Sequence, residues 1–155
     1  MTRTTEANIE RALVQTVRAQ NATFDAAVAS LAVADPVTGN AHTQLHGIHE
    51  GTAPPDTSYP FLTYRTVAAP VEDDWTKRTI LAAFDVEAWS DNSVEAKNLD
   101  ALAMTVIEDN LVAVTGQTTL LCRRVEGIRI PDTDETGRRI YRAGGTYAVW
   151  TDQAL

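Results

Sequence analysis

The clearest pattern of apolar and polar positions lies in the segment Phe84–Trp89. Its residues alternate between two faces of a strand, with Phe84, Val86 and Ala88 on one and Asp85, Glu87 and Trp89 on the other. A period of two is typical of a strand that has one face on a core. We expect the second face to meet water or a partner, because two carboxylates beside a tryptophan favour a contact surface over a catalytic pocket.

Three segments have the spacing of three and four residues that marks an amphipathic helix. They are Thr5–Arg18, a shorter piece over Asn21–Val33, and a long helix from Ser93 to about Leu111. The long helix follows Asn92, and Glu95 stands three residues later, an arrangement that resembles a capping box. We expect its apolar stripe to pack across the inner face of a sheet; the stripe comprises Leu99, Leu102, Ala103, Val106, Ile107 and Asn110.

Five segments read as strands from their aromatic, β-branched and alternating residues. They are 44–48, 61–67, 79–89, 119–130 and 138–152. An acidic connection, Pro70–Lys77, precedes the third, and a hairpin loop over Pro131–Gly137 separates the last two. Gly144 and Gly145 predict a bulge or bend in the final strand. The fold class is therefore α+β: a mainly antiparallel sheet of about five strands, packed against one long helix and one or two N-terminal helices, in a single domain over residues 1–155.

The length and the net charge of the chain predict a single core and argue against several classes of protein. A domain of 155 residues buries roughly 70% of the surface that its unfolded chain exposes, so one core is expected. The formal net charge of −8 argues against a nucleic-acid binder, because such binding depends on clustered Lys and Arg. No apolar run approaches the roughly 20 residues of a membrane helix. The first residues lack the apolar segment of a secretory signal, so we expect folding in the cytoplasm.

Residues with catalytic or metal-binding potential are few. His42, His46 and His49 are the one cluster with metal-ligand residue types, but on a strand His49 would point away from the other two. Cys122 reads as a small buried residue rather than a reactive thiol. The serines Ser30, Ser58 and Ser90 lie in no nucleophile elbow, and the sequence has no glycine-rich phosphate loop. We expect no enzyme activity, no cofactor and no bound metal.

Charge distribution instead predicts an assembly surface. The segment Glu72–Asp100 holds eight acids against three basic residues, whereas Arg123–Arg142 holds six arginines against four acids. Trp75 stands among acids, and a large aromatic residue in polar surroundings is typical of an interface anchor. The candidate interface residues are Trp75, Asp73, Asp74, Asp85, Glu87, Arg123, Arg124, Arg138 and Arg139.

Several motifs together resemble the tail terminator, or tail completion, proteins of long-tailed (siphovirus-like) bacteriophages. They are the strand led by a proline, Tyr59–Tyr64, the strand Phe84–Ser90, the helix from Ser93, and the closing Tyr147–Trp150. The resemblance implies a small α+β subunit that assembles as a ring, commonly a hexamer, on the head-proximal end of the tail tube.

From this resemblance we expect a structural virion protein that caps the tail tube, terminates its growth and joins the tail to the neck of the head. Its partners would be copies of itself, the major tail tube protein and a neck or head-completion protein, with assembly in the host cytoplasm. A ring contact joins two different patches, which the acidic and arginine-rich segments could supply. DNA would pass through the lumen without specific binding.

Three alternatives stay open at the level of sequence. A head-completion or neck protein, a stopper or adaptor, would bind the portal side only. A small metal-dependent hydrolase would use His42, His46 and His49. A soluble accessory or antitoxin-like module would remain a monomer or dimer outside any particle.

Overall fold

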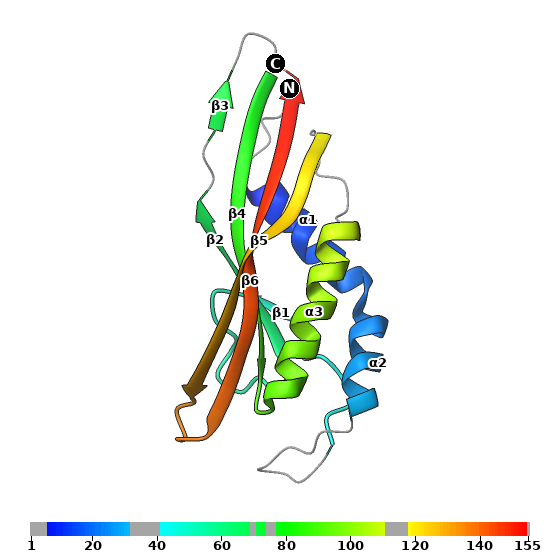
Figure 1. The fold of residues 1–155 in the computed structure, drawn as a ribbon, viewed down its shortest axis with the longest axis vertical. Coiled ribbons are helices and arrows are strands. Elements are labelled where there is room, and N and C mark those ends of the chain that lie inside the picture. The colour runs from blue at the N-terminus through cyan, green and yellow to red at the C-terminus, as the bar shows by residue number, and fades with distance from the viewer. Residues whose placement is uncertain (1–5, 32–40, 69–70, 74–76, 111–117, 155) are drawn as a thin grey trace.

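A computed structural model describes residues 6–31, 41–68, 71–73, 77–110 and 118–154. Three helices in these ranges pack on one side of a long twisted sheet (Figure 1). They are α1 (Glu6–Ala19), α2 (Asn21–Leu31) and α3 (Ser93–Asn110). Each lies where the apolar spacing predicts it, and the α+β class is confirmed.

The sheet contains six strands among the described residues. They are β1 (Ile48–Glu50), β2 (Phe61–Ala68), β3 (Val71–Asp73), β4 (Lys77–Ser90), β5 (Thr118–Thr133) and β6 (Arg139–Ala154). The order is β1-β2-β4-β6-β5, and β3 pairs with β4 beyond the end of β2. All pairs are antiparallel except β1 with β2. No helix of the described residues combines the length and apolar character needed to cross a membrane.

Three details differ from the sequence prediction. The first strand is short and starts at Ile48, later than predicted, because 42–47 leads into it without pairing as a strand. The acidic connection contains β3, whose short pairing with β4 carries no alternation long enough to recognise. The bulge predicted at Gly144 and Gly145 is wrong: both stay in continuous register with β4, and the register shifts lie in the neighbouring β5.

The core lies between the helices and the inner face of the sheet. Ile9, Leu13 and Val17 of α1 are buried, as are Phe24 and Val28 of α2. From α3 the core receives Leu99, Ala103, Val106 and Ile107, and from the sheet Ile80, Ala82, Phe84, Val86, Tyr147 and Val149. The apolar side of the Phe84–Trp89 strand therefore faces the helices as predicted, which leaves Asp85, Glu87 and Trp89 on the outer face.

Candidate functional site

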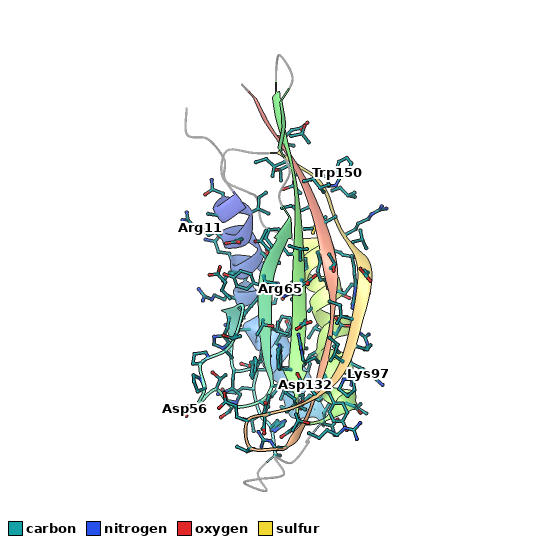
Figure 2. The ribbon with its side chains drawn as sticks, turned by 90° about the vertical axis from the view of Figure 1, so that its left-hand side faces the viewer. Arg11, Asp56, Arg65, Lys97, Asp132 and Trp150 are labelled. Atoms are coloured by element: carbon teal, nitrogen blue, oxygen red, sulfur yellow. The ribbon has the colours of Figure 1, made fainter. Side chains whose placement is uncertain are left out.

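Figure 2 looks onto the outer face of the sheet, with Arg65 near its centre, and none of the described helices covers this face. Asp85 accepts hydrogen bonds from Nε and Nη2 of Arg65, at 3.2 and 3.1 Å, and from Oγ1 of Thr146 at 2.6 Å. One row along, Glu87 accepts from Nη2 of Arg142 at 2.7 Å. The two acids are only 8% and 7% exposed, and their place in an interface stays a prediction. Cross-strand cations cover them.

Aromatic side chains continue this network toward the β5–β6 hairpin. The rings of Tyr59 and Phe61 stack at 5.4 Å, and Phe61 stacks on Trp89 at 5.7 Å. The Arg142 guanidinium lies 4.4 Å from the Trp89 ring centre, and the Trp89 indole N–H donates to Thr63. These aromatic rings line an open groove between the loop 52–57 and the hairpin.

Toward its other end, the outer face carries a row of apolar residues. Register places Leu81 of β4, Trp150 of β6 and Leu121 of β5 in one row across three strands. Trp150 is 43% exposed and Leu121 is 40% exposed. We call these three residues the apolar row. An exposed tryptophan flanked by leucines is the kind of anchor found at protein interfaces.

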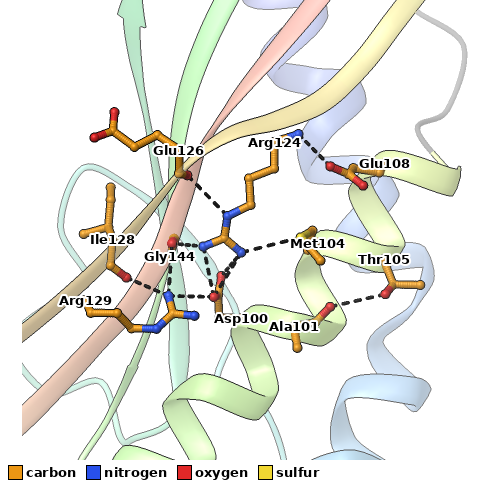
Figure 3. Close-up of polar contacts among 10 residues, drawn as sticks. All are labelled: Asp100, Ala101, Met104, Thr105, Glu108, Arg124, Glu126, Ile128, Arg129 and Gly144. Carbon is orange, nitrogen blue, oxygen red and sulfur yellow. Dashed lines mark hydrogen bonds and ion pairs between the residues drawn. The ribbon is translucent and has the colours of Figure 1, made fainter.

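On the inner face, Arg124 of β5 is bound to α3 (Figure 3). Its guanidinium forms an ion pair with Asp100 at 2.9 Å, donates to the carbonyl of Gly144, and lies 6.0 Å from the ring centre of Tyr147. Arg129 reaches the same carboxylate at 2.9 Å. Asp100 is buried, so two cations balance one buried negative charge.

The four arginines of the candidate interface do not form one cluster. Arg123 pairs with Ala148 in the sheet, whereas Arg139 pairs with Thr133 beside the hairpin loop, nine residues or roughly 30 Å further along β6. Arg123 and Arg139 are exposed. Arg138 forms an ion pair with Asp134 and lies over the Tyr59 ring, and Arg124 is bound to Asp100. Arg123 and Arg139 could therefore bind a partner, because neither would have to give up an ion pair with a carboxylate of its own chain.

The remaining interface candidates lie at or beyond the edge of the described structure. Asp73 is the last residue of β3, where its backbone pairs with Arg78. Asp74 and Trp75 lie outside the described residues. Their assignment to an interface stays a prediction.

The three histidines do not converge on one point. His49 hydrogen-bonds through Nε2 to the carbonyl of His46, and the pKa of His46 is lowered, first because of its burial. His42 turns to the start of α3, where its Nδ1 lies 2.8 Å from Oε1 of Glu95. The trio considered as a metal site is therefore not formed, and His42 instead meets Glu95 and Asp91.

The capping box at α3 forms only in part. The Asn92 side chain accepts from the backbone N–H groups of Val94 and Glu95, which confirms it as the N-cap. In a full capping box the Glu95 side chain would accept directly from the backbone N–H of Asn92. Here Ser90 lies between them: the backbone N–H of Asn92 donates to Oγ of Ser90, and the Ser90 hydroxyl donates to Glu95. The carboxylate is thereby turned inward toward His42.

Cys122 is a packed side chain, as predicted. It contacts the core, and its thiol donates weakly to the carbonyl of Ile107. Burial, with a smaller contribution from Glu108, raises its pKa to about 12. A thiol with so high a pKa is not a nucleophile at neutral pH.

Sequence reasoning missed the contacts of Asp100 and of His42, although a signal for the first was present. Asp100 follows Ala96 by four residues and precedes Ala103 by three, so a helical wheel places this acid on the buried stripe. An acid there requires a cation from the sheet. The contact between His42 and Glu95 joins positions 53 apart, and no periodicity reports it.

Comparison with known proteins gives a family match and solved structures of similar fold. A family model described as "Tail completion protein gp17" matches residues 22–152. The chain also superposes on a chain from a structure titled "Virion of native gene transfer agent (GTA) particle", with a TM-score of 0.60, 15% identity, and coverage of 93% of this chain and 94% of that one. At this identity the likeness concerns the fold alone. No curated protein matches the sequence.

Proposed function

The chain belongs to the family of the tail completion protein gp17, and from this premise we propose that it forms a ring that caps the tail tube, ends tube growth and joins the tail to the neck. The coarser statement, a structural virion protein of a phage-like tail, follows from the family itself. We further propose that the ring is hexameric, lies at the head-proximal end of the tail, and is assembled in the host cytoplasm.

The observation that best supports the proposal is the family match over 22–152, which spans every strand of the sheet except the last two residues of β6. The exposed surface is suited to such a role. A ring needs two different patches that meet between neighbours. The apolar row offers one, and the exposed Arg123 and Arg139 offer positive charge that can select the register of the contact.

We propose that acids of the segment Glu72–Asp74 on one subunit meet Arg123 on the next. Arg139, roughly 30 Å away along the sheet, would meet a different part of the neighbour. Asp85 and Glu87 are less suited to that role, because Arg65 and Arg142 already neutralise them. Their part would be to hold the outer face rigid. Trp75, adjacent to the acids, would enter the same contact.

The test is to measure the mass of the native assembly and to image it by negative stain in low and high salt. We expect rings in low salt and weaker assembly in high salt, because screening reduces contacts between exposed charges. Arg123→Glu and Arg139→Glu should each weaken the ring. Lys97→Glu on α3, an equal charge change on an exposed residue, is the matched control.

Incubation with tail tubes that lack this protein tests the capping role. A cap at one tube end and tubes that no longer elongate would support the proposal. Binding to filled heads but not to tubes would favour the neck or head-completion alternative. A protein that stays monomeric at all concentrations and binds neither would contradict both.

The passage of DNA is a separate part of the proposal. The net charge of −8 leads us to propose a lumen lined by acids, which repels phosphate and lets DNA pass without being held. An assembled ring whose lumen is lined by arginines would contradict it.

A further inference from the structure

The open groove between the loop 52–57 and the β5–β6 hairpin has a volume of about 500 Å³, within the roughly 300–1,000 Å³ of clefts that bind ligands. The sheet contributes Phe61, Trp89 and Ile140 to its lining, and the loop contributes a pair of prolines, 54 and 55. The hairpin segment 132–136 lines the opposite side. We propose that this groove binds an extended, proline-containing basic segment of a partner protein.

The aromatic lining is held in place before any partner arrives. The indole N–H of Trp89 donates to Oγ1 of Thr63 at 2.8 Å, and the Arg142 guanidinium lies over the same ring. The Arg138 guanidinium lies 4.9 Å from the ring centre of Tyr59, which also lines the groove. A surface that is already ordered loses less conformational entropy on binding.

The shape and polar groups of the lining favour an extended occupant over a helix. Proline-rich segments in the polyproline II conformation dock into grooves lined by aromatic side chains. Such a segment has no internal hydrogen bonds, so its carbonyl groups stay available. Hydroxyl groups of Thr52 and Thr57 on the loop side and of Thr133 on the hairpin side line the groove and can donate to those carbonyls. A helix would use its carbonyl groups internally.

Negative charge on the hairpin side indicates that the occupant is basic. Asp134 is used within the hairpin, where it accepts from the backbone N–H of Thr136 and forms an ion pair with Arg138. Glu135, the next residue, is exposed and forms no ion pair with any residue that the structure describes. Its carboxylate can therefore bind a cation of a partner without giving up an internal one.

Asp132 and Asp56 add negative charge on the two sides of the groove, and both are labelled in Figure 2. Asp132 is 45% exposed and lies 3.6 Å from Arg142, whose closer partner is Glu87 at 2.7 Å. Asp56 is exposed on the loop 52–57. These acids attract a lysine or arginine placed beside the prolines of a partner, and they repel the phosphates of a nucleic acid.

The proposal is tested by fluorescence anisotropy with a labelled peptide of three Pro-Pro-Arg repeats, added to the isolated full-length chain in low salt. Polyproline II has three residues per turn, so the arginines of this peptide share one face. We expect saturable binding of one peptide per chain. A Pro-Pro-Glu peptide should bind roughly tenfold more weakly because of its charge, and so should a Gly-Gly-Arg peptide, which must be ordered on binding.

Variants on both sides of the groove show where the peptide binds. Glu135→Lys on the hairpin and Pro54→Lys on the loop should each weaken binding of the Pro-Pro-Arg peptide roughly tenfold, because like charges then meet. Both residues are exposed, so the Tm should change little. Glu126→Lys on β5 and Val67→Lys on β2, at exposed positions outside the groove, are the matched controls and should leave the affinity unchanged.

Three results would overturn the proposal. The first is no saturable binding of the Pro-Pro-Arg peptide, or equally tight binding of either comparison peptide. The second is a loss of affinity in the controls as large as in the groove variants. The third is a peptide that binds the isolated chain but not the assembled ring, which would assign the groove to a second copy. Since binding is measured without a ring, it can fail while the proposed function stands, and the reverse.

Discussion

Gly145 allows Arg124 to lie across the sheet. A Cβ atom at this position would collide with Nε of Arg124 and would lie 2.6 Å from its Cζ and 2.5 Å from the carbonyl oxygen of Glu126. Gly145→Ala must therefore displace both a backbone strand and the guanidinium that binds Asp100. We expect a loss of about 1–3 kcal/mol in the free energy of unfolding, the cost of overpacking a filled site, measured by urea denaturation.

Gly127 is the matched control, because it pairs directly with Gly145 across the two strands. A Cβ atom there would lie 3.6 Å from the nearest side chain, an ordinary contact. Gly127→Ala should change stability by no more than about 0.5 kcal/mol. Equal effects at the two positions would show that the clash is relieved without cost.

Cys122 is expected to resist alkylation in the folded protein. Its pKa, raised to about 12 by burial and by Glu108, leaves a thiolate fraction of about one in ten thousand at pH 8, against about a tenth in the unfolded chain. Iodoacetamide should react roughly two to three orders of magnitude more slowly with the folded protein, as followed by mass spectrometry. As this is the only cysteine, the modified mass reports it directly. A rate equal to that in urea would contradict the burial.

At the scale of elements, Asp100 fastens α3 to β5. Its buried carboxylate binds both Arg124 and Arg129 (Figure 3). Asp100→Asn removes the negative charge and leaves Arg124, whose side chain is only 12% exposed, without its counter-ion. Removing one partner of a buried ion pair costs about 3–5 kcal/mol, and we expect about 3 kcal/mol from the urea midpoint because Arg124 retains some contact with water.

Two further variants serve as controls for Asp100→Asn. Arg129 is 51% exposed, so Arg129→Ala should cost less than about 1 kcal/mol, as for surface ion pairs. Joint replacement of Asp100 by Leu and Arg124 by Met should cost less than Asp100→Asn, because no charge is left buried alone. A double variant less stable than the single one would mean that the ion pair itself, not the unbalanced charge, controls stability.

The elements themselves could be predicted because each carries a local period. Leu99, Ala103, Val106 and Ile107 of the predicted α3 stripe lie in the core, as do Phe84, Val86 and Ala88 of the alternating strand, and Leu102 packs against it. The side chain of Asn110 lies outside the described residues. The strand β3 was missed because three residues are too few for a period to show. The glycine pair Gly144 and Gly145 predicts a bulge from local sequence. The structure instead uses the missing side chains to let Arg124 cross the strand, and this contact joins positions 20 apart, so no local pattern reports it.

The candidate site was less predictable, since it depends on register. The sequence places Asp85, Glu87 and Trp89 on one face, and this is confirmed. That Arg65 and Arg142 neutralise the two acids follows only from the pairing of β4 with β2 and β6. A shift of one residue in either pairing would have sent these cations to the other face.

At the scale of the whole molecule, the helices cover only the inner face of a sheet whose longest strands, at 16 residues, span roughly 50 Å. The strand β5 ends the sheet on one side, and none of the described strands pairs with its outer edge. Arg123 and Arg129 place charge along that strand, which disfavours indiscriminate pairing with other sheets. The outer face and this edge are thus the surfaces through which copies of the chain could join.

Trp150 is the residue of the outer face whose loss should matter most for assembly. If the apolar row is covered by a neighbour in the ring, Trp150→Lys places a charge where water is excluded. We expect the concentration for half-maximal assembly to rise by at least about tenfold, since a buried tryptophan anchor contributes 2 kcal/mol or more, as followed by sedimentation velocity. The Tm of the monomer should stay nearly unchanged, because the side chain is 43% exposed in the single chain. Val94→Lys, on a valine of α3 that is 56% exposed, controls for adding a lysine elsewhere. Assembly that tolerates Trp150→Lys as well as Val94→Lys would exclude the apolar row from the ring contact.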